Sequence, residues 1–523
     1  MTGSIFIKDD LNDIRSRGMT PEKVLKQIEG FKRGFPFAKL VRPCTIGDGI
    51  TVLDDSDIER LCEIYEKAVL SGRAMKFVPA SGAASRMFKL LLAYKTRFGK
   101  AKKADDVHGN GKDDPDYKMF LRFLNEIESF PFYEKLASTM SKKGIDIKMA
   151  LSEGNYKAIL DYTLGPEGLN LADLPKGLIP FHKYDDYSRT PFEEHIVEAG
   201  TYTCSKDGVA EIHFTVSPEH EDLIRRHIEE VRGRYEGSGL KYRFGFSCQK
   251  SSTDTIAVDM NDNPFRDIEG KLLFRPGGHG ALLENLSDLN GDVVFIKNID
   301  NVAPDRLKDT TYTYKRALGG YLIELQDRIF GYLGRLSGGD EDTSFTNEVL
   351  EFIRTTLSST LPAGIDKAAS KEKKEYLVSR LNRPLRVCGM VKNTAEPGGG
   401  PFWVRHRDGT ASIQIVETSQ MDMDSEEQKG IFQCSTHFNP TDLVCGVRDH
   451  TGRPFNLEDY VDHDTGLIAI KSKDGRELKA LELPGLWNGS MAYWNSIFVE
   501  VPLITFNPVK TVFDLLRKEH QPE

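Results

Sequence analysis

The sequence has no apolar run of about 18 residues, the length that a membrane-spanning helix requires. Its first segment, MTGSIFIKDDLNDIRSRG, also lacks the basic flank and the apolar stretch of a secretory signal peptide. The first absence argues against a membrane-spanning helix, and the second argues against export. We therefore expect a cytoplasmic protein without a membrane partner.

Paired cysteines are missing as well. The seven cysteines, at positions 44, 62, 204, 248, 388, 434 and 445, are scattered, odd in number and never spaced as CxxC. This pattern favours neither a disulfide framework nor a cysteine zinc site. We interpret them as reduced thiols that lie mostly in the core.

Positive charge is in deficit. Lys and Arg number 70 against 79 Asp and Glu, and the resulting net charge of −9 is spread along the chain. A nucleic-acid surface needs concentrated positive charge, so we expect small molecules rather than nucleic acid as partners. The 39% hydrophobic and 28% charged residues are typical of a globular protein.

At 523 residues, the chain exceeds one ordinary core and predicts a large domain with insertions or two to three domains. We expect residues 1–74 to form a helical N-terminal region. Strands and helices alternate over 75–385, which predicts a mostly parallel sheet, with helical insertions at about 90–172 and 304–381. Residues 386–523 are expected to be β-rich and to end in a helix, TVFDLLRKEH.

The stretch VPASGAASRMFK, residues 78–89, follows a strand-like apolar run. Small residues separate that run from a helical pattern, and Arg86 and Lys89 come next. A strand, a small-residue turn and a helix form a place where backbone N–H groups can face an anion. The same composition also suits a turn that only packs tightly, so the rest of the chain has to decide.

Further polar residues follow other predicted strands. They are Lys176 in LPKGLIPF, the glycines of RPGGHG and Asp300 at the end of VVFIKNID. Ligands of open α/β sheets collect beyond the carboxyl ends of the strands. Glycines allow close approach, lysines neutralise phosphate and a carboxylate can hold Mg²⁺. Taken singly, each feature is equally compatible with a solvated loop, a plain turn or a strand end.

Together these segments resemble the eukaryotic-type UDP-sugar pyrophosphorylases, particularly the UDP-N-acetylhexosamine branch. The resemblance rests on VPASGAASRMFK, LPKGLIPF, PGGHGALLENL, FIKNIDNV, IQIVETSQM and FNPVK, which keep the family's order over roughly residues 75–517. The chain also looks like a bacterial family of domains of unknown function built on this fold. The resemblance implies an α/β nucleotidyltransferase fold, glycosyltransferase-A-like and Rossmann-like, with a mixed sheet, helical insertions and a helical N-terminal layer.

Carried onto this chain, the resemblance implies a phosphate site. A loop formed by Ser81, Gly82, Ala83, Ala84 and Ser85 would surround the triphosphate. Arg86, Lys176 and Lys510 would be the catalytic cations, and Asp300 would bind Mg²⁺. Apart from the resemblance, Glu500 in the core-like run MAYWNSIFVEV is a candidate second metal ligand.

The resemblance also implies a base site and a sugar site. Gln249, Gly278, His279 and Gly280 would approach the base, and His279 stands where the pyrophosphorylases have asparagine. Glu417 and the segment EPGGGPF, which includes Glu396 and Gly399, would hold the sugar. The part from residue 386 onward would thus complete the sugar and phosphate site.

The implied activity joins a nucleoside triphosphate, preferentially UTP, to a sugar 1-phosphate and releases pyrophosphate. Ala84 stands where the family has a glycine that allows close approach. The alternative function, a catalytically silent protein that binds a nucleotide or a sugar nucleotide, therefore remains open. A glycosyltransferase would need an Asp-x-Asp motif at a strand end. The candidate, MDMD at 421–424, is interpreted as a loop. His195 in EEHIVE has no second histidine at zinc spacing, so we predict a capped amphipathic helix there.

Overall fold

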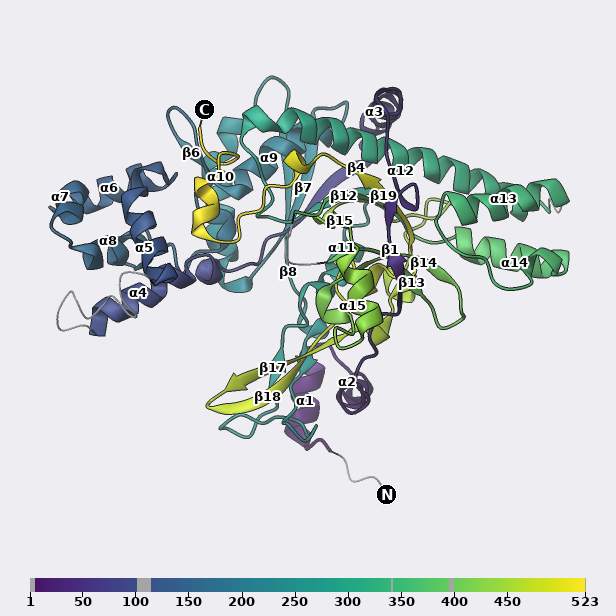
Figure 1. The fold of residues 1–523 in the computed structure, drawn as a ribbon, viewed down its shortest axis with the longest axis horizontal. Helices are drawn as coiled ribbons and strands as arrows, with labels where there is room; N and C mark the ends of the chain where they lie inside the picture. The colour runs from purple at the N-terminus through teal and green to yellow at the C-terminus, as the bar shows by residue number, and fades with distance from the viewer. Residues whose placement is uncertain (1–4, 101–113, 340–341, 395–398, 523) are drawn as a thin grey trace.

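A ten-stranded mixed sheet forms the centre of the described chain (Figure 1). The computed structural model describes residues 5–100, 114–339, 342–394 and 399–522. The strands follow the order β2 (Thr45–Ile46), β3 (Gly49–Thr51), β19 (Asn495–Glu500), β12 (Leu385–Lys392), β16 (Asp442–Gly446), β11 (Val293–Lys297), β4 (Ala74–Pro79), β7 (Val209–Val216) and β8 (Lys241–Cys248), with β15 (His437–Phe438) beside β12.

Most neighbours in this sheet are parallel, and β16 runs antiparallel to both β11 and β12. The carboxyl ends of β4, β7, β8, β11, β12 and β19 therefore share one edge. Every residue of strand β11 is buried, which explains why its sequence, VVFIK, is mostly apolar. Val293 and Phe295 pack on one face of the sheet, and Val294 and Ile296 pack on the other. The predicted mixed α/β fold is confirmed.

Helices cover both faces. Helices α3 (Asp55–Val69), α12 (Lys308–Ser337), α13 (Thr343–Thr355) and α14 (Ser370–Leu381) contribute to the apolar cluster on the first face, and α11 (Leu282–Asp288) to that on the second. In Figure 1, α12 runs along the sheet and ends beside α13 and α14. The segment 304–381 is thus helical, and α12 is packed into the core. Helices α9 (Pro191–Tyr202) and α10 (Glu221–Tyr235) pack with β7.

The segment 90–172 contains helices α4 (Lys89–Lys100), α5 (Pro115–Asn125), α6 (Tyr133–Ser141), α7 (Ile147–Ser152) and α8 (Tyr156–Leu164). These helices share an apolar core of their own, seen to one side of the sheet in Figure 1. Val302, Val509, Val512 and Leu515 belong to the same cluster. The helical unit therefore packs directly on the residues that flank Asp300 and Lys510.

The N-terminal region contains α1 (Lys8–Ser16), α2 (Pro21–Arg33) and α3, as the predicted helical layer requires. It also contributes β1 (Leu40–Pro43), β2 and β3, which the sequence analysis did not predict. These strands have two to four residues each, too few for a periodic pattern to appear in the sequence.

The C-terminal part adds the paired strands β13 (Gly400–Arg405) and β14 (Ala411–Val416) and the hairpin of β17 (Leu467–Lys473) and β18 (Arg476–Glu482). The helix predicted in TVFDLLRKEH is reduced to a 3-10 turn, Val512–Leu516. Asp514 accepts hydrogen bonds from the N–H groups of Lys510 and Thr511. The Arg517 guanidinium donates a hydrogen bond to the carbonyl of Pro508. We call residues 508–517, which these contacts hold together, the C-terminal strap.

All seven cysteines are free thiols. No helix in the described ranges combines the length and the apolarity that crossing a bilayer would demand.

Candidate functional site

The loop after β4 forms one wall of the site. Ala80 donates its N–H to Thr215 O (2.8 Å), which fixes where the loop leaves the sheet. Ala84 is buried and donates its N–H to Leu174 O (3.2 Å), whereas Ser81, Gly82, Ala83 and Ser85 are exposed. A Cβ added to Gly82 would meet nothing within 4 Å. The loop thus presents small side chains to open space. Arg86, in a 3-10 turn after it, is exposed and has no ion-pair partner among the described residues.

Asp300 is the centre of the charged residues at this edge. The Lys176 ammonium lies 2.7 Å from Asp300 Oδ2, and the Lys510 ammonium lies 3.2 Å from the same oxygen. Asp300 is only 8% exposed, whereas 60% of the Lys510 side chain is exposed. The structure thus brings together three predicted site residues that are 124 and 210 positions apart.

The charge states follow from this packing. Burial would raise the pKa of the Asp300 carboxyl, but the ammonium groups of Lys176 and Lys510 outweigh it and hold that pKa below its usual value. Burial lowers the pKa of Lys176, and Asp300 opposes that shift. Asp514, which accepts the N–H of Lys510, is a second carboxylate near Lys176. The lysines of this site are charged donors of the kind that suits a phosphate.

Backbone hydrogen bonds hold these side chains in place. Lys176 donates its N–H to Gly82 O (3.0 Å), which joins the lysine to the loop. Val509 donates its N–H to Asp300 O (3.1 Å), which joins the C-terminal strap to the end of β11. The site is therefore fixed by main-chain contacts as well as by ion pairs.

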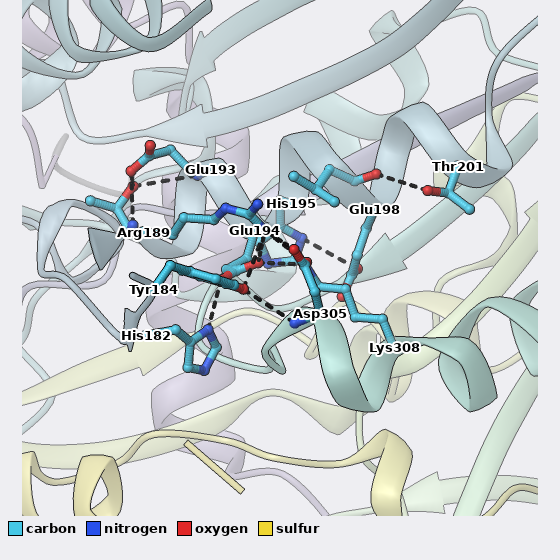
Figure 2. A network of polar contacts seen from close by, with 12 residues as sticks. His182, Tyr184, Arg189, Glu193, Glu194, His195, Glu198, Thr201, Asp305 and Lys308 are labelled. Carbon is cyan, nitrogen blue, oxygen red and sulfur yellow. Dashed lines mark hydrogen bonds and ion pairs between the residues drawn. The ribbon is translucent and has the colours of Figure 1, made fainter. Parts of the chain in front are cut away.

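His195, on helix α9 (Figure 2), contacts the backbone just before Asp300. Its Nε2 lies 3.2 Å from Asn298 O and 3.3 Å from Ile299 O, so the N–H at this atom holds the two carbonyls before Asp300. Burial keeps the pKa of His195 well below its ordinary value, so the ring is neutral. The sequence analysis missed this positioning role, because the contact joins residues 103 and 104 positions apart.

Helix α9 is capped as predicted: Thr190 is its N-cap and forms a capping box with Glu193. The prediction of an amphipathic helix is wrong, because the helix is buried nearly all round. Its acidic residues are paired with buried cations: Glu198 lies 2.6 Å from Lys76 and 2.8 Å from Lys297. In the described part of the chain, no group of three or more His, Cys, Asp or Glu side chains is arranged to hold a metal ion.

The same helix carries a second buried pairing, shown in Figure 2. Glu194 accepts hydrogen bonds from Lys308, from the Tyr184 hydroxyl (2.9 Å) and at 2.8 Å from His182 Nδ1. Asp305 pairs with Arg189 at 2.7 Å. His182 Nε2 lies 2.8 Å from His520 Nδ1, so this buried pairing connects α9 with the end of the chain.

The predicted base-binding residues gather at another part of the same edge. Gln249 directly follows β8, and its Nε2 is buried without a hydrogen-bond partner in the described ranges. Gly278 has φ +77°, a conformation that glycine adopts without strain. A Cβ on Gly280 would overlap Pro484 O, so the loop packs closely on the segment after β18. Strands β8 and β4 lie two strand spacings apart, a separation of about 10 Å.

His279 connects the base and sugar groups. Its ring stacks on Trp487, with 4.3 Å between ring centroids, and its Nδ1 accepts a hydrogen bond from Leu486 N (3.1 Å). Its Nε2 lies 3.9 Å from Glu417 Oε1. Burial lowers the pKa of His279 to about 4. Trp487 was not predicted, and no local pattern in the sequence marks it as a partner of residue 279.

The predicted sugar residues are adjacent. A Cβ on Gly399 would come within 3.1 Å of Glu417 Cγ, so these two residues are packed together. Burial and the neighbouring Glu482 raise the pKa of Glu417. Glu396, in the same predicted segment, lies outside the described residues.

Two alternatives are not supported by the geometry. Glu500 ends β19, three strand spacings from β11, so about 14 Å separates it from the strand of Asp300 and it cannot share a metal ion with that carboxylate. Glu500 instead lies 3.4 Å from His437 Nε2. In the MDMD motif, Asp422 accepts the N–H of Asp424 (3.2 Å) in a turn before α15 (Glu426–Gln433), as a loop would.

A cavity of about 800 Å³ opens between α2, α11 and β18. Gly280 belongs to its lining, which includes none of the other predicted site residues. The candidate site therefore rests on the strand ends and their charges, and we assign no role to this cavity.

No curated protein matches this chain. Among solved structures, a UDP-N-acetylglucosamine pyrophosphorylase from Trypanosoma brucei is 13% identical, with a TM-score of 0.47 over 94% of this chain and 74% of that one. A UDP-glucose pyrophosphorylase variant from Leishmania major is 11% identical, with a TM-score of 0.44 over 97% and 77% of the two chains. A family model described as "Domain of unknown function (DUF4301)" matches residues 7–521, and the chain therefore belongs to that family.

Proposed function

We propose that this protein is a nucleotidyltransferase that joins a nucleoside triphosphate, preferentially UTP, to a sugar 1-phosphate and releases pyrophosphate. The observation that carries the proposal is the convergence of Lys176 and Lys510 on Asp300, beside the open loop at Gly82. These residues were assigned to one phosphate site from the order of the sequence motifs alone. Their convergence supports that assignment.

In the proposed reaction, a phosphate oxygen of the sugar 1-phosphate attacks the α-phosphorus of the triphosphate. A new P–O bond forms as the α–β anhydride bond breaks, and pyrophosphate leaves. The attacking phosphate monoester is already largely ionised near neutral pH, so no general base is required. Catalysis then depends on positioning and on charge neutralisation.

The cations have separate positions in this scheme. Lys176 and Lys510 hold one carboxylate between them in the free protein, and bound phosphates would share their charge. Arg86, exposed and unpaired in the described chain, would contact the triphosphate from the end of the loop. Each charged contact would be stronger in the transition state if the developing charge lies between the lysines.

Asp300 fits as a Mg²⁺ ligand only together with substrate. Mg²⁺ usually binds one or two carboxylates and completes its shell with water and phosphate oxygens. Lys176 and Lys510 both contact Oδ2 of Asp300, which leaves Oδ1 for the ion. When bound, Mg²⁺ would neutralise phosphate charge.

The base and sugar assignments extend the proposal. The unpaired amide of Gln249 is suited to donate a hydrogen bond to a base, and the glycines at 278 and 280 keep the approach open. Glu417, beside Gly399 and 3.9 Å from His279, would accept a hydrogen bond from a sugar hydroxyl.

The test is a matrix of nucleoside triphosphates and sugar 1-phosphates with Mg²⁺ present, read by pyrophosphate release. We expect at least one pair to react, with UTP preferred, and the reaction to be lost on chelation of Mg²⁺. Failure of every pair, together with no triphosphate binding by calorimetry at millimolar concentration, would refute the site.

A catalytically silent nucleotide- or sugar-nucleotide-binding protein is the second candidate. One observation favours it: Ala84 has its N–H committed to Leu174 O, so this amide is not free for a phosphate. Triphosphate binding without pyrophosphate release for any sugar 1-phosphate would identify this second function.

A further inference from the structure

Arg380, near the end of α14, carries a buried charge without a counter-ion. The residue is 8% exposed, and among the described residues its guanidinium has neither a hydrogen-bond partner nor an ion pair. Buried charges in proteins are normally paired, because an isolated one costs several kcal/mol of desolvation. Burial and the neighbouring Arg383 lower the pKa of Arg380 to about 10. A bound anion would supply the missing partner of the Arg380 guanidinium.

The guanidinium of Arg380 adjoins a cavity of about 260 Å³ that lies apart from the candidate site. The wall combines α14 with the turn between β13 and β14. Its cationic members are Arg380, Arg383 and Arg407, and Asp408 is the one carboxylate in the lining. Positive charge is thus in excess within a small enclosed volume.

The other charged groups of the lining are already engaged. Asp408 Oδ1 accepts hydrogen bonds from the N–H (2.9 Å) and the hydroxyl (2.6 Å) of Thr410. Arg407 pairs with Asp464, outside the lining. Arg383 donates to Ser379 O (2.8 Å) and Tyr493 O (3.4 Å), which are carbonyls and leave its charge uncompensated. Asp408 attracts Arg380 through its charge, but no carboxylate in the described chain forms an ion pair or a hydrogen bond with Arg380.

Hydroxyl and imidazole groups complete the wall. Ser412 Oγ lies 2.7 Å from His406 Nε2 and accepts from Gln414 Nε2 at 3.0 Å. Thr360 Oγ1 accepts the N–H of Ala411 (2.7 Å), so its own proton is available as a donor. Burial lowers the pKa of His406. Two arginines with hydroxyl donors match the planar, multiple-donor recognition of phosphate oxygens.

We propose that this cavity is a binding site for a small phosphate-bearing anion, either inorganic phosphate or a phosphate monoester, with Arg380 as its principal partner. The site does not depend on the proposed transferase activity, because its residues come from α14, β14 and the turn before β14. Strand β14 continues from Ser412 to Val416, just before Glu417, so the new site adjoins the candidate sugar site through one strand.

The experiment measures thermal unfolding with inorganic phosphate, against sodium chloride at equal ionic strength. A ligand that binds the folded state raises the unfolding temperature by an amount that grows with the ratio of its concentration to its Kd. We expect Arg380→Met to have a higher unfolding temperature than the wild type without phosphate, because an unpaired buried charge is removed. We also expect at least a tenfold loss of phosphate affinity. Arg15→Met, at an exposed arginine of α1, should leave both properties unchanged.

The candidate site also binds phosphate in our proposal, so the measurement is repeated in Lys510→Ala. A phosphate response that survives Lys510→Ala and is lost in Lys510→Ala/Arg380→Met supports the new site. A response that is lost with Lys510→Ala alone, or that persists in the double variant, overturns it, as does an equal response to chloride. If Arg380→Met does not fold, Arg383→Gln replaces it with the same expected loss of response.

The source of the anion is resolved with ribose 5-phosphate as a second probe. Tighter binding of the ester than of inorganic phosphate identifies a phosphorylated metabolite. Equal or weaker binding of the ester identifies free phosphate. Absence of both responses overturns the proposal.

Discussion

Lys176 Nζ lies 2.7 Å from Asp300 Oδ2, and this pair is the closest charged contact of the candidate site. The Lys510 ammonium shares the same oxygen at 3.2 Å. One buried carboxylate thus holds two lysines that would otherwise repel each other. The arrangement keeps the cations in place before any phosphate arrives, which is the preorganisation that electrostatic catalysis needs.

Asp300→Asn is expected to raise the Mg²⁺ concentration needed for pyrophosphate release by at least tenfold. It should also lower the free energy of unfolding by about 3–5 kcal/mol, since Lys176 would remain buried without its partner. Because the pKa of Asp300 is depressed, its stabilisation is present above the ordinary carboxyl pKa and is lost as the pH falls through the lower, folded-state value. Activity titrations with Mg²⁺ and urea unfolding measure both effects, and Asp173→Asn, at an exposed neighbour, is the control. An unchanged Mg²⁺ requirement would remove Asp300 from the metal site.

Lys510→Ala should change the free energy of unfolding by less than about 1 kcal/mol, because an exposed ion pair contributes little. Transition-state stabilisation should fall by roughly 2–4 kcal/mol, the scale of one preorganised contact. Lys510→Arg should restore only part of the loss. Values of kcat/KM for the triphosphate measure these changes, with exposed Lys471→Ala as the control. Wild-type kinetics in Lys510→Ala would show that Lys510 takes no part in catalysis.

Two glycines should respond in opposite ways to alanine. Gly280→Ala places a Cβ against Pro484 O, so we expect a clear loss of stability by thermal unfolding. Gly82→Ala meets no atom within 4 Å and has no positive φ, so its stability should be unchanged while triphosphate affinity falls. Calorimetry with UTP measures the affinity. Unchanged binding by Gly82→Ala would show that the loop does not closely approach the phosphates.

Glu198→Gln removes the carboxylate that lies between Lys76 and Lys297. All three side chains are buried, so we expect a loss of about 3–5 kcal/mol in the free energy of unfolding. Urea unfolding measures the loss against Glu59→Gln, at an exposed position of α3. Equal stability of the two variants would mean that the buried lysines are neutral or re-paired.

His279 should make stability fall with acid. Its folded-state pKa is about 4, below the ordinary value near 6.5, so between these values the unfolded chain binds a proton that the folded chain does not. Stability therefore rises with pH across this window. His279→Asn should lose less stability than the wild type when the pH is lowered from 7 to 5, measured by urea midpoints. Exposed His463→Asn should behave as the wild type; an identical loss in His279→Asn would contradict the shift.

The sequence was most informative where the physics is local. Apolar runs such as VVFIK predicted the buried strands, and residues just past those strands, such as Lys176 and Asp300, could be expected at one edge of the sheet. Contacts across long separations were not predictable. The role of His195 depends on carbonyls at 298 and 299, and the stacking of Trp487 on His279 joins residues 208 positions apart. The expected final helix failed because tertiary contacts of Asp514 and Arg517 replaced helical hydrogen bonds.

The C-terminal strap ties the order of folding to the formation of the site. Val512 donates its N–H to Met87 O (3.1 Å), and Val509 bonds to Asp300, so the strap closes both the helical unit and the end of β11. During synthesis, the first 500 residues can form most of the sheet, but the apolar surface near Met87 stays uncovered until the strap emerges. Lys510 arrives in the same step. Lys510 therefore reaches Asp300 and Lys176 only when the apolar surface near Met87 is covered, and a partly folded chain would lack this contact.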